Sequence, residues 1–182
     1  TKAVVFAPDF NQVAKFADQW VPLHAGSDGA YWMAVSHVIL KEFHHERKIP
    51  YFIEYAKRYT DCPYLVELEE TDGEYRPGRL VRANQMEKSR DAENGEWKFL
   101  NIDAESGECV MPKGSVGHRW DSQPGNWNLK MEDGATDETF NPILSLLGVE
   151  EDVQQVAFTE FGTNTTAQRG VPIKHLDCEK GR

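Results

Sequence analysis

The feature that most constrains the fold is a long apolar segment that begins directly after a Gly-Ser-Asp sequence. From Asp28 to about Glu46, apolar side chains recur on nearly every side of the helix that their spacing predicts. A helix that is apolar on every face is normally buried, and we expect this one to pack against a sheet. The segment turns polar over residues 44–48, where we expect the helix to emerge and to end.

Around this helix, the first third of the chain alternates between predicted strands and helices. Residues 2–7 are a continuous β-prone apolar run that Pro8-Asp9 closes, which is typical of a strand buried on both faces. The remaining elements follow in turn: a short helix over 11–19, a strand at 20–23, a helix that opens at Pro50 and a strand at 64–68. The sequence therefore predicts an α/β fold in which residues 1–68 form a βαβαβ-like, Rossmann-like parallel sheet.

For residues 69–182 the sequence predicts an irregular extension rich in β-hairpins. The turn at 71–74 is of the kind that joins hairpin strands, and a second hairpin is expected from strands at 97–102 and 109–111. Gly and Pro recur through 112–134, which disfavours long regular elements there. We find no internal repeat in the sequence. This layout is typical of part of a larger α/β domain that carries an insertion.

Composition narrows the classes of partner and compartment. With 30 acidic and 20 basic residues the formal charge is -10, and no basic stripe could neutralise phosphates, so we expect no nucleic acid partner. The longest apolar run, residues 30–35, is far shorter than the roughly 20 residues that span a bilayer. Cys62, Cys109 and Cys178 fit no disulfide framework or metal motif, and they indicate isolated thiols in a reducing compartment. Because the chain starts at Thr1 without Met and enters a strand at once, we expect a segment of something longer.

Two loops carry the strongest candidate binding residues. In an open parallel sheet, ligands bind beyond the carboxyl ends of the strands, which is where we expect the loops 7–11 and 22–30. Gly26 and Gly29 allow a ligand or another backbone to approach closely. The free N–H groups of the helix start can hold an anion such as phosphate. The carboxylate of Asp28 can accept hydrogen bonds from a base edge with two adjacent donors, as guanine has.

Ordinary structural roles compete with these interpretations. Ser27 or Asp28 can cap the helix, and an acidic residue in the first turn is favoured by the helix dipole, although capping and binding can coexist. His44 and His45 suggest a metal site, but adjacent helical residues point about 100° apart. His37 shares a face with His44, yet no third ligand is spaced to join them. We favour a solvated helix end over a metal site.

A Trp-rich stretch offers a further candidate. His118 and Arg119 could serve as an acid–base group and an anion clamp, but nothing pairs with them at a recognisable spacing. Trp120 and Trp127 could line a pocket or anchor a loop to the core or to a partner. We favour anchoring, because a large aromatic side chain supplies much buried area in a segment without regular structure.

The same loops carry a resemblance to a known family. Residues 3–10, 18–20 and 26–40 resemble one stretch of the molybdopterin oxidoreductase family. The match narrows to the α (catalytic) subunits of membrane-bound respiratory nitrate reductases over several further segments: 41–44, 51–52, 57–66, 77–79, 96–98, 114–120 and 144–148. The resemblance spans nearly the whole chain, whereas the subunits it resembles are several times longer.

This resemblance implies a set of functional assignments. The family holds molybdenum in two molybdopterin guanine dinucleotides and reduces nitrate to nitrite in anaerobic respiration, with electrons that enter through iron–sulfur clusters. In the family, the matching loops bind one guanine dinucleotide, so that residues 1–182 would be part of one such binding domain. Carried over residue by residue, the cofactor contacts are Pro8, Asp9 and Phe10, and the guanosine end is held by Gly26, Ser27 and Asp28.

The resemblance also implies what these residues lack. In the family, the molybdenum ligand and the ligands of the [4Fe–4S] cluster come from segments that precede Thr1, so we expect no catalytic or metal-binding residue here and no activity of this piece alone. The implied partners are an iron–sulfur β subunit and a membrane-anchor γ subunit, which would hold the enzyme at the cytoplasmic face of the membrane. Two alternatives stay open: a relative that acts on another oxyanion or oxidises nitrite, and a non-catalytic nucleotide-binding or interaction module.

Overall fold

The chain forms two compact units, Thr1–Ile49 and Pro50–Arg182. The structure is a computed structural model, and it describes residues 1–113, 131–160, 163 and 165–176. The division at Ile49 comes earlier in the chain than the change of character that the sequence predicts at residue 69.

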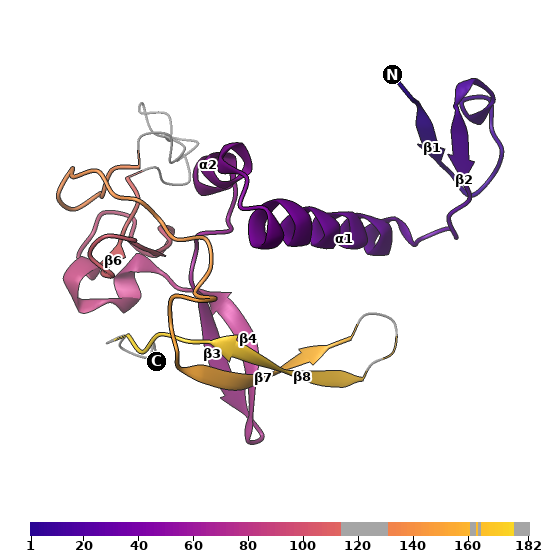
Figure 1. The fold of residues 1–182 in the computed structure, drawn as a ribbon. Coiled ribbons are helices and arrows are strands. Elements are labelled where there is room, and N and C mark those ends of the chain that lie inside the picture. Colours follow the sequence, from indigo (N-terminus) through magenta and orange to yellow (C-terminus); the bar gives the residue numbers. More distant parts are fainter. Residues whose placement is uncertain (114–130, 161–162, 164, 177–182) are drawn as a thin grey trace. The chain divides into compact units, whose positions relative to one another are not determined.

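The first unit consists of a parallel pair of short strands followed by a long helix (Figure 1). β1 (Val4–Phe6) lies parallel to β2 (Gln19–Val21). α1 (Asp28–Ile39) continues directly into η2 (Leu40–Glu46), a π-helical stretch. Together α1 and η2 cover the residues for which the sequence predicts one helix, so this prediction of the helix and its bounds is confirmed.

The helix predicted over residues 11–19 is wrong. The structure has only a single 3-10 turn there, η1 (Ala14–Phe16). The side chain of Asn11 accepts hydrogen bonds from two backbone N–H groups at the start of this turn. The Oδ2 atom of Asp18 accepts one from the backbone N–H of Ala3 at 2.7 Å. That bond ties the end of the segment to the start of β1, so the chain enters β2 before a helix can extend.

The predicted burial of α1 is also wrong for this structure, because none of its residues is buried. The ring of Tyr31 lies 4.3 Å from the ring of Phe6, measured between centroids, and this contact joins α1 to β1. The sheet that the helix was expected to cover has two strands in the part of the chain that the structure describes. A pair of strands of three residues each is too narrow to cover all sides of a helix of 12 residues.

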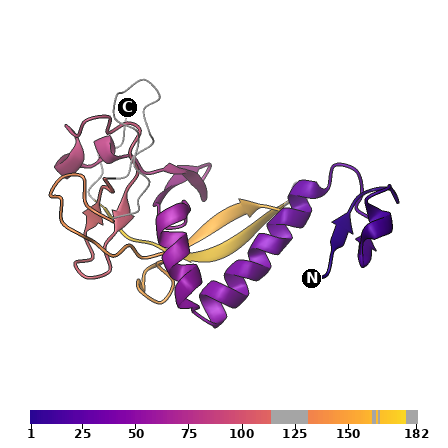
Figure 2. The ribbon, with the colours of Figure 1, turned by 90° about the horizontal axis from the view of Figure 1, so that it is seen from above.

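Among the described residues, the second unit contains the α-helix α2 (Pro50–Tyr59) and a mixed four-stranded sheet (Figure 2). α2 opens at the proline, as the sequence predicts. The strands of the sheet, in their spatial order, are β3 (Val66–Thr71), β4 (Glu74–Leu80), β7 (Val153–Thr159) and β8 (Thr166–Pro172). β4 is parallel to β7, and the other neighbours are antiparallel.

The third strand of the predicted parallel sheet therefore belongs to a different sheet. The residues expected to join β1 and β2 instead enter β3, which pairs antiparallel with β4. Asp72 and Gly73 have φ angles of +56° and +79°, the left-handed conformation that a two-residue hairpin loop requires. The hairpin predicted at residues 71–74 is confirmed. The fold thus combines helices with parallel and antiparallel strands, and its Rossmann-like description stays a prediction.

The core of the second unit is a cluster of buried apolar residues that follow the β3–β4 hairpin in the chain. It is built from Val81, Ala83, Leu100 and Met111. Two 3-10 turns follow the sheet hairpin, η3 (Ala83–Gln85) and η4 (Glu87–Ser89). The second predicted hairpin is confirmed as β5 (Asn101–Ile102) and β6 (Cys109–Val110), which pair antiparallel.

Two successive hairpins of the second unit repeat one local structure at an interval of 30 residues, from Asp103 to Asp133. Asp103 accepts hydrogen bonds from the backbone N–H and the hydroxyl of Ser106. Correspondingly, Asp133 accepts one from the hydroxyl of Thr136. The cross-strand pairs repeat as well: Ile102 with Cys109, and Glu132 with Thr139.

The two copies also pair with each other reciprocally. Asp103 forms a bridge with Pro142, and Pro112 forms the equivalent bridge with Asp133. The matching backbone bonds run from Ala104 N to Asn141 O at 2.8 Å and from Gly134 N to Met111 O at 2.6 Å. The hairpins are therefore related by a local twofold arrangement, and the expectation that the chain has no internal repeat is wrong.

Candidate functional site

The two candidate loops leave the same edge of the first unit. Because β1 and β2 are parallel, their carboxyl ends lie side by side at one edge of the pair (Figure 1). The loop that follows β1 contains Pro8, Asp9 and Phe10, and the loop that follows β2 leads to the start of α1 at Asp28. All six predicted contact residues thus belong to one unit and follow one edge of its sheet.

Trp20 of β2 supports the base of the first loop. Its indole Nε1 donates a hydrogen bond to the backbone oxygen of Ala7 at 3.1 Å. The rings of Phe10 and Trp20 meet edge to face at 5.4 Å between centroids. Pro8, Asp9 and Phe10 remain exposed to solvent, so Trp20 fixes the base of the loop and leaves its residues free for contact.

The start of α1 has a glycine where the backbone requires one. Gly26 has a φ of +83°, and a Cβ placed there or at Gly29 would meet no atom of the described residues within 4 Å. Gly26 is therefore needed for its left-handed backbone, whereas the space beside both glycines is open. The hydroxyl of Ser27 donates to the backbone oxygen of His24 at 2.6 Å.

These contacts show that the Ser27 side chain does not cap the helix, and they leave the carboxylate of Asp28 without a partner in the described part of the chain. The side chain of Ser27 makes no capping bond to the helix, so the interpretation of Ser27 as a side-chain cap is wrong. Asp28 is the first residue of α1 and is exposed. Its carboxylate has no hydrogen-bond or ion-pair partner in the part of the chain that the structure describes. The helix dipole favours an acidic side chain at this position, and the free carboxylate can still accept external donors.

The histidines near the end of the helix form a different environment. Burial lowers the pKa of His44, and the nearby charges of His45 and Lys48 lower it further. Its Nδ1 atom is buried and has no hydrogen-bond partner among the residues that the structure describes. Within the described ranges, no group of three or more His, Cys, Asp or Glu side chains could hold a metal ion.

The cysteines and the Trp-rich stretch are the remaining candidates from the sequence. Cys62 is exposed and Cys109 is half-buried. Cys178, His118, Arg119, Trp120 and Trp127 lie outside the described residues. Over the residues that are described, no helix is both long enough and apolar enough to cross a membrane.

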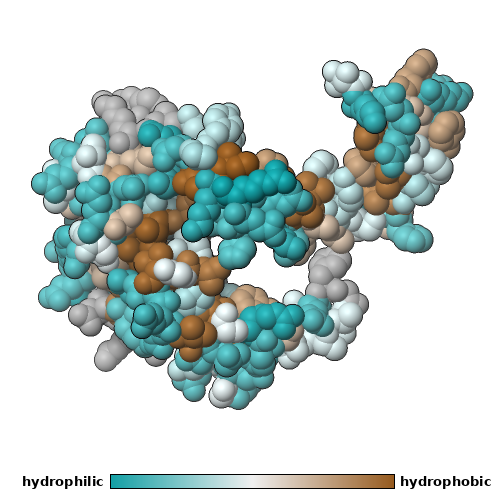
Figure 3. Space-filling model, in the orientation of Figure 1, coloured by the Kyte–Doolittle hydropathy of each residue, from teal (hydrophilic) through white to brown (hydrophobic). Residues whose placement is uncertain are grey.

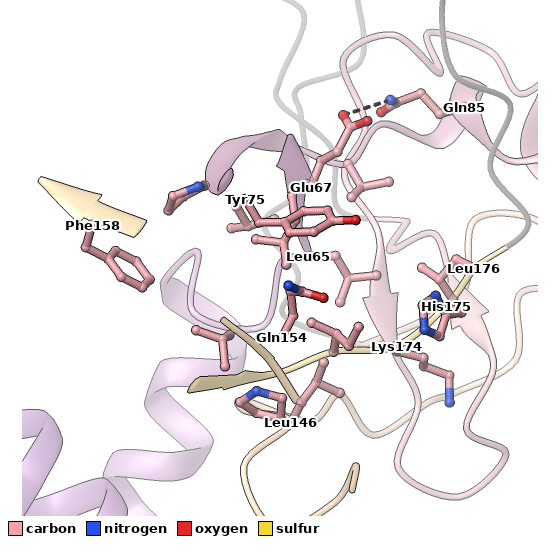
Figure 4. Close-up of a pocket in the computed structure, with 17 residues that line it drawn as sticks. Leu65, Glu67, Tyr75, Gln85, Leu146, Gln154, Phe158, Lys174, His175 and Leu176 are labelled. Atoms are coloured by element: carbon pink, nitrogen blue, oxygen red, sulfur yellow. Dashed lines mark hydrogen bonds between the residues drawn. The ribbon is translucent and has the colours of Figure 1, made fainter. Parts of the chain in front are cut away.

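Sequence reasoning missed a hollow in the second unit. A cavity of about 610 Å³ lies against the four-stranded sheet and is lined mainly by apolar side chains (Figure 4). Two of its polar side chains have partners: Gln85 donates a hydrogen bond to Glu67, and the Nζ atom of Lys174 lies 3.0 Å from a carboxylate oxygen of Glu150. The lining comes from strands far apart in the chain, so no local pattern could have predicted it.

Comparison with known proteins identifies relatives of the whole stretch, although no protein-family model matches it. The chain is 42% identical over 193 residues to the respiratory nitrate reductase 1 alpha chain of Escherichia coli K12, with 100% of this chain and 15% of that protein covered. It is 39% identical to the nitrate reductase alpha chain of Bacillus subtilis 168, with 97% and 14% covered. It is also 39% identical to the respiratory nitrate reductase 2 alpha chain of E. coli K12, with 100% and 15% covered.

The matches cover nearly all of this chain but only a small part of each relative. The chain spans about 15% of the length of the curated relatives it matches, and the similarity runs along all or nearly all of its own residues. The resemblance found in the loops after β1 and β2 is thus part of a continuous similarity. By sequence, this chain belongs with the α chains of nitrate reductases, of whose length it represents one stretch.

Proposed function

We propose that this chain forms part of the guanine dinucleotide site of a molybdenum-dependent nitrate reductase. The observation that carries the proposal is the unpaired, exposed carboxylate of Asp28 at the start of α1, beside two open glycine positions. The similarity to nitrate reductase alpha chains supports the reaction, the reduction of nitrate to nitrite by the longer protein. When bound, the molybdenum of the cofactor supplies the redox chemistry that removes an oxygen atom from nitrate.

Asp28 is the residue that recognises the base. Guanine presents two adjacent N–H donors, and a carboxylate with two free oxygens accepts both. Ser27 and Gly26 set the position of this carboxylate: the Ser27 hydroxyl is bonded to His24, and Gly26 takes the left-handed turn into the helix. The N–H groups of the first helical turn have no partner within the helix, and they are suited to a phosphate oxygen of the dinucleotide.

The loop after β1 lies along another part of the cofactor. Phe10 is 57% exposed and offers an apolar ring for a flat heterocycle, while Trp20 supports the ring from behind. Pro8 restricts the backbone at the point where β1 ends. The carboxylate of Asp9 has no partner among the described residues and faces solvent. These residues bind and orient the cofactor, and none of them performs the redox step.

The remaining parts of the assembly follow from the same proposal. The parallel pair β1–β2 is the beginning of a Rossmann-like sheet, and further strands come from the longer α chain. The molybdenum ligand and the [4Fe–4S] ligands also lie outside these residues, so this stretch alone is inactive. A β subunit with iron–sulfur clusters and a membrane-anchoring γ subunit complete the enzyme, which acts at the cytoplasmic face of the membrane.

Guanine nucleotide binding tests the assignment of Asp28. We expect GDP to bind this chain more tightly than ADP, measured by calorimetric titration. The Asp28→Asn variant should lose the preference, because an amide offers only one acceptor and places a donor against a donor. A lost charged hydrogen bond contributes about 1.5–3 kcal/mol, which corresponds to roughly a tenfold to hundredfold weaker affinity.

The control is Asp91→Asn, which removes another exposed carboxylate remote in sequence from the candidate loops. It should leave the GDP affinity unchanged. In the longer α chain, Asp28→Asn should lower the guanosine content released from the purified protein on acid treatment, whereas Asp91→Asn should not. Full retention of bound guanosine and of the GDP preference in Asp28→Asn would contradict the proposal.

A further inference from the structure

α1 leaves large apolar side chains uncovered on several sides. Trp32 and Met33 are each 60% exposed and Val38 is 48% exposed. Successive helical residues point about 100° apart, so these three side chains project in three different directions. Hydrophobic side chains are visible at the surface of both units (Figure 3), and on α1 the three exposed apolar side chains lie on different sides of one helix. Such a helix is typical of a protein interior and not of a single flat interface.

The charge pattern of α1 narrows what can cover it. Residues 28–39 contain no Lys, Arg or Glu; the titratable side chains are Asp28 at the start, Tyr31, and His37 in the last turn. A helix that lies on a lipid surface keeps a charged face toward water, and α1 has none. A second copy of the chain, packed across a twofold axis, would cover one face and leave the others exposed.

The size of the related proteins supplies an occupant. The chain covers about 15% of the α chains to which it is similar, so most of such a protein lies outside these 182 residues. We propose that α1 is enclosed by other segments of the longer α chain and forms an interior helix there, with apolar protein surface on each of its sides. The proposal rests on the relationship to the α chains and is independent of what binds at Asp28.

Methionine oxidation measures this enclosure directly. Met33 is 60% exposed, whereas Met111 and Met131 in the second unit are 4% and 8% exposed and act as buried references. Limited treatment with hydrogen peroxide converts accessible methionine to the sulfoxide, which peptide mass spectrometry quantifies. In the 182-residue chain we expect Met33 to react roughly tenfold faster than Met111, in line with these exposures.

In the longer α chain, assembled as the holoenzyme, the oxidation of Met33 should be as slow as that of Met111. The same measurement on guanidinium-unfolded protein gives the intrinsic rate of each site, and Met33→Leu identifies the peptide signal. Rapid oxidation of Met33 in the holoenzyme would overturn the proposal. Slow oxidation of Met33 in the 182-residue chain would also overturn the proposal. If that slow rate depends on protein concentration, a second copy of the chain covers α1. If the rate does not depend on concentration, other residues of the same chain cover α1. The result does not depend on guanosine content, so its failure is distinct from failure of the cofactor assignment.

Discussion

At the scale of single residues, two buried carboxylates hold the hairpin repeat together. Asp103 is a hydrogen-bond acceptor for the Ser106 backbone at 2.9 Å, the Ser106 hydroxyl at 2.7 Å and the Asn141 backbone at 2.8 Å. Asp133 accepts longer bonds, 3.1 Å from the Ala135 backbone and 3.2 Å from a hydroxyl. The same position in the two copies therefore has different importance, although both side chains are buried.

We expect Asp103→Asn to destabilise the chain more than Asp133→Asn does. The Asn side chain has one acceptor oxygen, so it cannot accept the hydrogen bonds that the second carboxylate oxygen of Asp103 accepts. A hydrogen bond to a charged group contributes about 1.5–3 kcal/mol. The loss for Asp133→Asn should be smaller, since its bonds are fewer and longer. Urea unfolding at pH 7 measures both. Equal losses would contradict the ranking.

The pH dependence of this effect has a defined sign. Burial alone would raise the pKa of Asp103, but the hydrogen bonds from Asn141 and Ser106 outweigh it and the pKa lies below its ordinary value. The unfolded chain therefore takes up the proton first as the pH falls. The stabilisation by Asp103 should be complete above about pH 4 and should fade below it, so that the wild type and Asp103→Asn converge in acid.

His44 is a basic group, unlike Asp103, and it affects the stability of the folded chain in a different pH range. Burial, and then the charges of His45 and Lys48, keep its pKa below the ordinary value, so the folded chain disfavours protonation of this ring. As the pH falls through about 6.5, the unfolded chain gains a proton that the folded one does not, and stability decreases. We expect His44→Gln to reduce this loss between pH 7.5 and pH 5, measured by amide hydrogen exchange over residues 28–46, because His44 lies in the first unit. His24→Gln, an exposed histidine, is the control and should follow the wild type.

At the scale of elements, local signals predicted well and long-range ones did not. The helix start at Asp28 and the hairpin turn at Asp72-Gly73 follow from neighbouring residues, and both are confirmed. The side-chain bond from Asp18 to Ala3 spans 15 positions and prevents the predicted helix over 11–19, which no local pattern reveals. Likewise, which sheet a strand joins depends on pairing that periodicity does not encode.

The missed repeat has a physical explanation. Between the two hairpins, residues at equal positions are identical at the turn Asp, at the Glu that ends the turn and at the Pro that follows: Asp103 and Asp133, Glu108 and Glu138, Pro112 and Pro142. The first accepts the turn bonds, and the third takes part in the reciprocal bridges. The other positions need only fit the hairpin, so the pattern Asp-x-x-Ser/Thr-x-Glu-x-x-x-Pro is the signal that could have found the repeat.

At the scale of the whole molecule, the two units differ in how much they bury. The buried residues of the first unit are Ala7 and Ala14, whereas the second unit contains the apolar cluster around Leu100 and the repeat. A chain of about 40 residues or fewer seldom buries enough apolar surface to fold alone, and the first unit is barely longer. The stability of these residues in isolation should therefore reside in the second unit.

Separate expression of residues 1–49 and 50–182 tests this difference. We expect the 50–182 piece to unfold cooperatively in urea with the midpoint of the full chain, and the 1–49 piece to show no cooperative transition by circular dichroism. The reason is that two buried alanines contribute little, while the exposed side chains of α1 gain nothing until other protein covers them. Cooperative unfolding of the 1–49 piece would mean that the parallel pair and α1 stabilise each other without outside contacts. In that case the nucleotide loops would be preorganised, and GDP affinity would be the same for the 1–49 piece and the full chain.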